Sequence, residues 1–290
     1  MNKKMLTGVG TALITPFHNN KVDYECYGKL VERQVNEGVN FLVPLGTTAE
    51  TPCLTEEEKI KLLKITKERA EGLPLLVGAG SNNTNAVIST VKEYAKYGAD
   101  AMLIVVPYYN KPTQDGMIKH FTAIADASPK PIVIYNVPGR TGSNMLASTT
   151  LELSKHNNII GIKEASGNYA QISEIIKNAP KDFSVLSGND DDTLSLMATG
   201  GDGVISVASN IAPSLMASLT SLLQKDEIKE ARELFYKLMP LFKNCFIESN
   251  PIPVKAGMAC MGLIENELRS PLFPATENTI QIMKTTVSEL

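Results

Sequence analysis

The sequence predicts an α/β protein, a (β/α)₈ TIM barrel that carries a C-terminal helical appendage. Three observations support this prediction. Eight short apolar runs begin near residues 8, 39, 74, 101, 131, 159, 184 and 203, at intervals of about 20–35 residues. Amphipathic segments lie between these runs, as in parallel βαβ units. The runs are apolar throughout and do not alternate with polar residues, which is typical of strands covered on both faces.

Glycines and a helix cap mark the boundaries of the repeating units. Gly38, Gly72 and Gly98 each follow an amphipathic segment and precede an apolar run, which places them at helix ends. Thr55 and Glu58 have the spacing of a capping box, so we expect a helix to begin there. A further helical face is predicted from apolar residues at helical spacing, namely Ala86, Val87, Val91, Tyr94 and Ala95.

The number of units and the C-terminal pattern define the expected organisation. Eight units are the number that closes a barrel, and an open doubly wound sheet is the alternative that the pattern leaves. Beyond the last strand, helical segments are expected at 214–224, 226–245, 251–261 and 275–288. The last three exceed what the eighth unit of a barrel needs. We therefore expect a barrel domain over 1–225 and a helical C-terminal domain over 226–290.

Composition limits the classes of function. The 290 residues have a formal net charge of −3, without the excess of positive charge that binds nucleic acid or an anionic membrane. No apolar run reaches the ~18 residues of a membrane span, and the amino-terminal segment lacks the apolar stretch of a signal peptide. The four cysteines and three histidines are scattered, without metal-ligand spacing. We expect a cytoplasmic protein that uses no metal and no cofactor.

The catalytic face of a parallel barrel lies at the C-terminal ends of its strands. Lys163 ends the apolar run that begins at Ile159, where a solvated lysine is not expected. Strict alternation along this strand would place Ile159, Gly161 and Lys163 on one face, with Gly161 leaving room for the lysine. The same alternation on the preceding strand would bring Tyr135 to the level of Lys163.

Two interpretations of Lys163 remain open at this point. The side chain could simply extend from the strand end to water. A desolvated lysine, in contrast, serves as a nucleophile, because its neutral amine attacks a carbonyl carbon and forms a Schiff base. Burial that lowers its pKa by ~3 units would make the neutral form abundant near pH 7. Tyr135, together with a threonine and a second tyrosine, would supply the proton relay that this chemistry needs.

Six motifs carry a resemblance to a known family. They are GTTAE at 46–50, PYYNKPTQDG at 107–116, YNVPGRTG at 135–142, GIKEASG at 161–167, SGND at 187–190 and GVISVASN at 203–210. With them the chain resembles the class I pyruvate aldolases of the dihydrodipicolinate synthase/N-acetylneuraminate lyase superfamily over nearly its whole length. Within this superfamily the chain is most similar to the dihydrodipicolinate synthase branch.

The resemblance implies roles for eight residues. Lys163 would form the Schiff base with pyruvate, and Tyr135 would transfer protons beside it in a relay with Thr47 and Tyr109. In the family the second tyrosine comes from the partner across a tight-dimer interface. The amides and hydroxyls of Thr47 and Thr48 would hold the pyruvate carboxylate. The other pocket residues implied by the resemblance are Gly188, Ile205 and Arg140.

Arg140 distinguishes the branches of the superfamily. In dihydrodipicolinate synthases the arginine of the GRTG segment binds the carboxylate of L-aspartate 4-semialdehyde, and the sialic acid lyases lack it. The resemblance therefore implies a lyase that condenses pyruvate with this aldehyde to 4-hydroxy-tetrahydrodipicolinate, the first committed step of diaminopimelate and lysine biosynthesis. A sibling aldolase of the N-acetylneuraminate lyase type, acting on a sugar-derived 2-keto acid, is the alternative. A homotetramer built as a dimer of tight dimers is also implied.

The chain departs from the family pattern in one region. Lysine-inhibited members carry histidine and glutamate residues in an effector site at the tight-dimer interface. The matching positions in this chain hold Glu56, Lys59 and Ala86. We therefore predict that feedback inhibition by L-lysine is weak or absent.

Two acidic features near the expected site have structural explanations. Asp190, Asp191 and Asp192 open a helical segment, where they would act as a cap favoured by the helix dipole. Glu164 follows Lys163 and points to the other face of its strand. We expect Glu164 to form an ion pair there.

Overall fold

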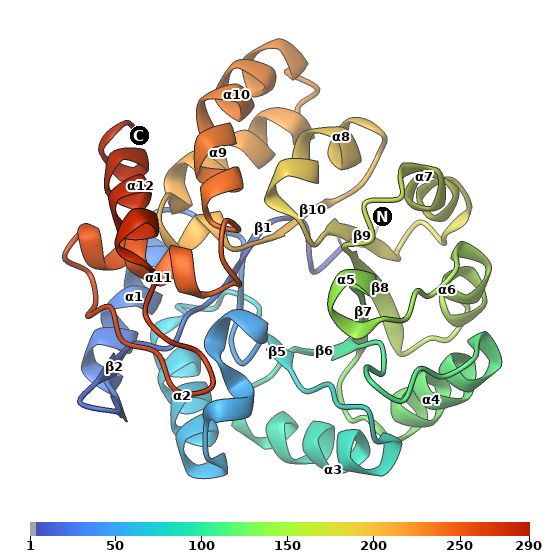
Figure 1. Ribbon diagram of the computed structural model, residues 1–290. Coiled ribbons are helices and arrows are strands. Elements are labelled where there is room, and N and C mark those ends of the chain that lie inside the picture. Colours follow the sequence, from blue (N-terminus) through green and yellow to red (C-terminus); the bar gives the residue numbers. More distant parts are fainter. Residues whose placement is uncertain (1–3) are drawn as a thin grey trace.

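The structure, a computed structural model, describes residues 4–290 and has the predicted (β/α)₈ barrel. Eight parallel strands follow one another in the order β4-β1-β10-β9-β8-β7-β6-β5. A parallel bridge between Leu42 and Leu75 and a hydrogen bond from the Gly78 amide to the Pro44 carbonyl join the two ends of this sheet. Figure 1 shows the helices arranged around the strands. The alternative of an open doubly wound sheet is thus excluded.

The barrel strands coincide with the eight apolar runs. They are β1 Gly8–Ala12, β4 Phe41–Val43, β5 Leu76–Gly78, β6 Ala101–Val105, β7 Ile132–Asn136, β8 Ile159–Glu164, β9 Ser184–Ser187 and β10 Gly203–Ser206. The helices between and after them are α1 Tyr24–Asn36, α2 Glu56–Arg69, α3 Thr84–Tyr94, α4 Gln114–Ala127, α5 Pro138–Thr141, α6 Ala147–Leu153, α7 Tyr169–Asn178, α8 Thr193–Ala198 and α9 Pro213–Gln224. A short antiparallel hairpin, β2 Phe17–His18 with β3 Lys21–Val22, was not predicted.

Local signals in the sequence define several helix ends. The Thr55 hydroxyl accepts a hydrogen bond from the Glu58 amide at 3.2 Å, and the Glu58 carboxylate accepts one from the Thr55 amide at 2.9 Å. The predicted capping box is therefore confirmed at the start of α2. Gly38, Gly72 and Gly98 have φ values of 83°, 89° and 88°, in the left-handed region that glycine adopts readily after a helix.

The strand side chains divide between two apolar cores. The outer core lies between the strands and the surrounding helices. The inner core fills the barrel and consists of Leu6, Ala12, Phe41, Val43, Leu76, Ala101, Leu103, Val133, Tyr135, Val137, Leu186 and Ile205. Gly10 makes room for the Phe41 ring, because a Cβ at Gly10 would come within 2.0 Å of that ring. The interior is thus a packed core and not a channel.

A β-bulge interrupts the alternation along β8. The register between β7 and β8 shifts at Ile160, and Ile159 packs in the outer core instead of sharing the face of Lys163. A Cβ at Gly161 would meet the carbonyl oxygen of Ser184 at 2.6 Å. This glycine therefore makes room for the neighbouring strand. The expectation that Ile159 shares the face of Lys163, which assumed strict alternation, was wrong, whereas the room that Gly161 would leave for the lysine stays a prediction.

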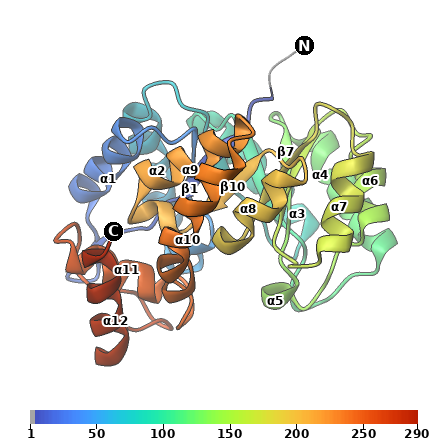
Figure 2. The same ribbon diagram turned by 90° about the horizontal axis from the view of Figure 1, so that it is seen from above.

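Three helices follow the barrel, α10 Ile228–Asn244, α11 Ile252–Cys260 and α12 Glu277–Ser288. Their positions agree with the predicted segments. α11 packs on α12, and α10 contacts both α9 and α12. In Figure 2, α11 and α12 lie at the same lower end of the molecule as α5, which follows the C-terminal end of β7. The division into domains 1–225 and 226–290 stays a prediction.

Candidate active site

Lys163 and Tyr135 lie side by side on neighbouring strands. In the pairing of β7 with β8, Tyr135 is directly opposite Lys163. Lys163 is 6% exposed and Tyr135 is 9% exposed. The Lys163 Nζ has no hydrogen bond or salt bridge within residues 4–290, and it lies 4.3 Å from the centroid of the Tyr135 ring. The strand end thus holds a buried amine without a counter-ion, next to a phenol.

Burial sets the protonation of this pair. It lowers the pKa of Lys163 to about 8, because the ammonium loses contact with water. The charge of Arg140 lowers this pKa further, and that of Asp190 raises it. At a pKa of 8 about a tenth of the amine is neutral at pH 7, against roughly one part in 2,500 for a free lysine. Burial raises the pKa of Tyr135 to about 12, so its hydroxyl stays protonated and can donate.

Gly188 and Ile205, two of the residues implied by the resemblance, lie next to this pair. A Cβ at Gly188 would come within 3.1 Å of Lys163 Cε, so the glycine leaves space for the lysine side chain. Ile205 is fully buried and belongs to the same core cluster as Tyr135. Gly188 directly follows β9, which pairs with β8, and Ile205 lies on β10, the next strand along the sheet.

The turn after β4 carries Thr47 and Thr48. It forms a single turn of 3₁₀ helix, Thr47–Ala49, and the amides of its first two residues have no hydrogen-bond partner within residues 4–290. Thr47 is exposed, whereas Thr48 is 2% exposed. The Thr48 hydroxyl accepts a hydrogen bond from Asn250 Nδ2 at 2.9 Å. Sequence reasoning missed Asn250, since no motif marks it.

Arg140 lies in α5, in the connection after β7, and is exposed. Its positive charge lowers the pKa of both Lys163 and Tyr135, so it acts on the same site. Substrate-binding residues often lie on loops that a rigid barrel supports, and Arg140 has such a position.

A buried network holds the connection that carries Arg140. The Asn136 side chain accepts a hydrogen bond from the Met145 amide at 3.0 Å and donates to the Glu164 carboxylate at 3.1 Å. Gln171 also donates to Glu164, at 3.1 Å. Glu164 is 1% exposed and forms no salt bridge within the described chain. The expected ion pair was therefore wrong, and amide donors satisfy this carboxylate instead.

Tyr109 does not reach the pair within its own chain. Its side chain is 89% exposed, and its backbone has a φ of 70° in the left-handed region. Among the hydrogen bonds of residues 4–290, none connects Tyr109 with Tyr135 or Thr47. A single chain therefore leaves the expected relay incomplete.

The acidic run after β9 is not a simple helix cap. Asp190 is 2% exposed and accepts hydrogen bonds from the amides of Val207 and Ala208, at 3.1 and 2.9 Å. It thus joins the loop after β9 to the loop after β10. The side chains of the run make no capping hydrogen bond to the helix that follows. The three residues do open the helical segment, as expected, but the expected cap was wrong.

Metal-binding clusters and membrane-spanning helices are absent from the described residues. Within residues 4–290 no group of three or more histidine, cysteine, aspartate and glutamate side chains could hold a metal ion. In the same part of the chain no helix is both long and apolar enough to cross a membrane.

Comparison with known proteins places the chain in a family. The sequence model of the dihydrodipicolinate synthetase family matches residues 5–290. The chain is 47% identical to the 4-hydroxy-tetrahydrodipicolinate synthases of Thermotoga neapolitana (98% of this chain, 99% of that protein) and Phocaeicola vulgatus (100% and 99%). It superposes on the crystal structure of dihydrodipicolinate synthase from Thermotoga maritima with a TM-score of 0.97, at 46% identity and 98% coverage of each chain. The chain therefore belongs to the dihydrodipicolinate synthetase family.

Proposed function

We propose that the chain is a Schiff-base-forming lyase that condenses pyruvate with L-aspartate 4-semialdehyde to give 4-hydroxy-tetrahydrodipicolinate. This reaction is the first committed step of diaminopimelate and lysine biosynthesis. The observation that carries the proposal is the buried and unpaired amine of Lys163 against the Tyr135 ring. The names of the curated relatives support the choice of substrates and do not favour the alternative, an aldolase of the N-acetylneuraminate lyase type.

The first stage forms the Schiff base. The neutral amine of Lys163 adds to the C2 carbonyl carbon of pyruvate, and the carbinolamine loses its oxygen as water. Tyr135, whose pKa of about 12 keeps it protonated, donates the proton that leaves with this water. The unpaired amides of Thr47 and Thr48 would hold the pyruvate carboxylate during this step. Gly188 and Ile205 would line the pocket around the bound pyruvate.

The second stage forms the carbon–carbon bond. The iminium withdraws electrons, so the C3 methyl group loses a proton and an enamine forms. The enamine carbon adds to the aldehyde carbon, and the aldehyde oxygen takes up a proton. The amino group of the second substrate then attacks C2 and displaces Lys163, which closes the six-membered ring. Arg140 would bind the carboxylate of the aldehyde substrate through its two-pronged guanidinium.

We further propose a homo-oligomer in which Tyr109 completes the relay of a second subunit. The 89% exposure of Tyr109 supports this, because its side chain is free to reach a neighbouring subunit. One similar structure, with a TM-score of 0.97 and 46% identity, is described as the first monomeric dihydrodipicolinate synthase variant. A tetramer built from two tight dimers is the arrangement we propose, and sedimentation of the purified protein tests it.

The central test measures pyruvate consumption with single aldehydes. L-aspartate 4-semialdehyde, N-acetylmannosamine and glyceraldehyde are each supplied with pyruvate. Turnover confined to the first is the expected result, and turnover with a sugar aldehyde would favour the alternative. In parallel, borohydride with pyruvate should add a reduced pyruvate adduct to Lys163. If no adduct forms on Lys163, the Schiff-base proposal is wrong.

The role of Arg140 has a separate test. Arg140→Ala should raise KM for the aldehyde by about tenfold to a hundredfold, since a bound carboxylate loses a charge-assisted partner. KM for pyruvate should stay within about twofold. Arg232→Ala, which removes an exposed arginine from α10, is the matched control and should leave both constants unchanged. Equal aldehyde affinity in the Arg140 variant would contradict the assigned substrate.

Weak or absent inhibition by L-lysine also remains our proposal. Lys59 forms an ion pair with Glu56 at 2.7 Å, and the Tyr94 hydroxyl donates to Glu56 at 3.3 Å. These side chains therefore bind one another. Strong inhibition by submillimolar L-lysine in a steady-state assay would contradict this proposal.

A further inference from the structure

The C-terminal helical segment reaches the turn that carries Thr47 and Thr48. Asn250, just before α11, donates to the Thr48 hydroxyl. Lys255, within α11, forms a 2.7 Å ion pair with Glu50, which directly follows the turn. Both contacts are buried and join residues more than 200 positions apart in the chain. This segment therefore contributes directly to the geometry of a turn in the barrel.

The direction of the hydrogen bond from Asn250 has a chemical consequence. Because Nδ2 donates and the Thr48 oxygen accepts, the proton of the Thr48 hydroxyl stays available to an anion. Consecutive hydrogen bonds strengthen one another in a buried environment. The Oδ1 atom of Asn250 is buried without a partner among residues 4–290. A buried acceptor without a partner costs stability.

Glu50 holds the other end of the turn. Its backbone has a φ of 54°, a left-handed conformation that is uncommon for residues other than glycine. Lys255 Nζ donates to Glu50 Oε1 at 2.7 Å and to the Thr15 carbonyl at 2.9 Å. The amide of Arg269 donates to Glu50 Oε2 at 3.0 Å. The carboxylate is thereby fixed on both oxygens.

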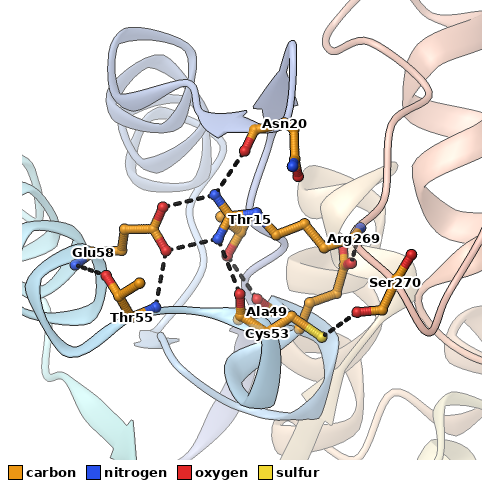
Figure 3. Close-up of polar contacts among 9 residues, drawn as sticks. Thr15, Asn20, Ala49, Cys53, Thr55, Glu58, Arg269 and Ser270 are labelled. Atoms are coloured by element: carbon orange, nitrogen blue, oxygen red, sulfur yellow. Dashed lines mark hydrogen bonds and ion pairs between the residues drawn. The ribbon is translucent and has the colours of Figure 1, made fainter.

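The side chain of Arg269 makes a second set of polar contacts with this connection, which Figure 3 shows. Its guanidinium donates to both oxygens of Glu58 at 2.7 Å and to the carbonyl of Cys53 at 3.0 Å. Glu58 belongs to the capping box of α2, and Cys53 lies between the turn and that helix. Arg269 of the C-terminal segment therefore binds three points of the connection from the turn to α2, namely Glu50, Cys53 and Glu58.

We infer that Asn250 is a positioning residue for the substrate carboxylate and acts through the Thr48 hydroxyl. The C-terminal segment thus completes the pyruvate carboxylate site of the barrel. This inference rests on the proposed function, since it assigns the anion at this turn to pyruvate. It predicts that the loss of the Asn250 donor weakens pyruvate binding and leaves the second substrate unaffected.

The first experiment replaces Asn250 by leucine, which has a similar size and no polar atoms. KM for pyruvate should rise about tenfold, which corresponds to about 1.4 kcal/mol. The kcat and the KM for the aldehyde should change by less than about twofold, because an interaction made equally in the ground and transition states affects KM alone. An unchanged KM for pyruvate would overturn the inference.

Asn244→Leu is the matched control. Asn244 Nδ2 donates to the Thr286 hydroxyl at 2.7 Å, so it makes the same kind of hydrogen bond between α10 and α12. It lies in the same helical segment and makes no hydrogen bond to the turn within residues 4–290. This variant should keep the KM for pyruvate of the unmodified protein. A rise equal to that of the Asn250 variant would show a general structural effect and overturn the inference.

A double-mutant cycle separates positioning from packing. Thr48→Val removes the hydroxyl through which Asn250 acts. In that background Asn250→Leu should cause no further rise in KM for pyruvate. If Asn250→Leu raises KM for pyruvate by the same factor with and without Thr48→Val, the inference is overturned.

Asn250→Asp decides the outcome if the leucine variant does not fold. A carboxylate at this position can only accept, so it accepts a hydrogen bond from the Thr48 hydroxyl, which then no longer donates to the substrate, and its charge repels the anion. KM for pyruvate should then rise by more than tenfold, and an unchanged value would overturn the inference.

A trapping assay keeps this test separate from that of the proposed function. The pyruvate concentration that half-saturates borohydride labelling of Lys163 reports pyruvate binding without any aldehyde. If the unmodified protein labels but does not turn over L-aspartate 4-semialdehyde, the proposed function fails while the Asn250 effect remains measurable. If the Asn250→Leu variant half-saturates at the same concentration as the unmodified protein, the inference fails alone.

Discussion

Two buried lysines of this chain differ in whether they have a counter-ion. Lys163 on β8 is 6% exposed, and Lys255 on α11 is completely buried. Each Nζ lies over an aromatic ring, at 4.3 Å from the centroid of Tyr135 and 4.4 Å from that of Phe17. Burial lowers the pKa of both. Burial and an aromatic neighbour alone therefore do not define a reactive lysine.

The difference between the two lysines is the counter-ion. Lys255 forms its ion pair with Glu50, and this carboxylate raises the pKa of Lys255 against the effect of burial. Lys163 has no such partner within the described chain, and its pKa falls to about 8. A paired ammonium is a structural link, whereas an unpaired amine of which about a tenth is neutral at pH 7 can act as a nucleophile.

The largest expected effect is that of Lys163→Met on activity. The variant lacks the nucleophile, so kcat should fall by at least about a thousandfold. Borohydride with pyruvate should leave no adduct, which mass spectrometry checks. Lys61→Met, which replaces an exposed lysine of α2, serves as the control and should retain full activity. Residual activity near that of the unmodified protein would remove Lys163 from the mechanism.

The same substitution, Lys163→Met, tests how a buried lysine without a counter-ion affects the free energy of unfolding. A charged lysine without a partner opposes folding, so Lys163→Met should raise the free energy of unfolding at pH 7 by on the order of 2 kcal/mol. Between pH 8 and about 10.4 the unfolded chain holds a proton that the folded chain has lost, so the stability of the unmodified protein rises with pH. The gain from the substitution should shrink over this window. Urea denaturation at several pH values measures it.

Lys255→Met should have the opposite effect on stability. It leaves Glu50 buried and charged without its partner, so the free energy of unfolding should fall by about 3–5 kcal/mol. Lys96→Met breaks the exposed pair with Glu93 and should change it by less than about 1 kcal/mol. Denaturant unfolding of the three proteins makes the comparison. Equal effects of the two substitutions would show that the buried pair is no structural link.

Tyr135→Phe makes the surroundings of Lys163 resemble those of Lys255. The ring under Nζ remains and only the hydroxyl is lost, so the variant isolates proton transfer from packing. We expect kcat to fall by about a hundredfold to a thousandfold, the range of general acid–base catalysis. The melting temperature should change little. A steady-state assay with full kcat would assign Tyr135 a packing role only.

The pH dependence of the reaction gives the smallest predicted effect. Because the reactive amine has a pKa of about 8, kcat/KM for pyruvate should rise about tenfold between pH 7 and pH 9. A Lys255→Met variant that still folds should show the same midpoint of the pH profile, since the Lys255 ammonium donates to Glu50 and Thr15 and not to the reacting atoms. A profile that is flat over this range would contradict a lysine nucleophile with a lowered pKa.

Much of the fold follows from local signals in the sequence. The eight apolar runs, the capping box at Thr55 and the glycines after helices all act within one element or one turn, where chain-neighbour chemistry decides the outcome. The exceptions are the β2–β3 hairpin and the bulge at Ile160. The bulge depends on the register with a neighbouring strand, which a period-two pattern does not contain.

The sequence by itself determined the barrel, the position of Lys163 at a strand end, and Tyr135 opposite it. Only the tertiary structure decided which charged groups are paired. Lys255 stands in the apolar stretch of α11, a signal that could have marked it, yet its partner Glu50 lies 205 positions away. Glu164, expected in an ion pair, is bound by amides instead. The energy of a buried charge depends on atoms within a few ångströms, and folding brings these from distant parts of the chain.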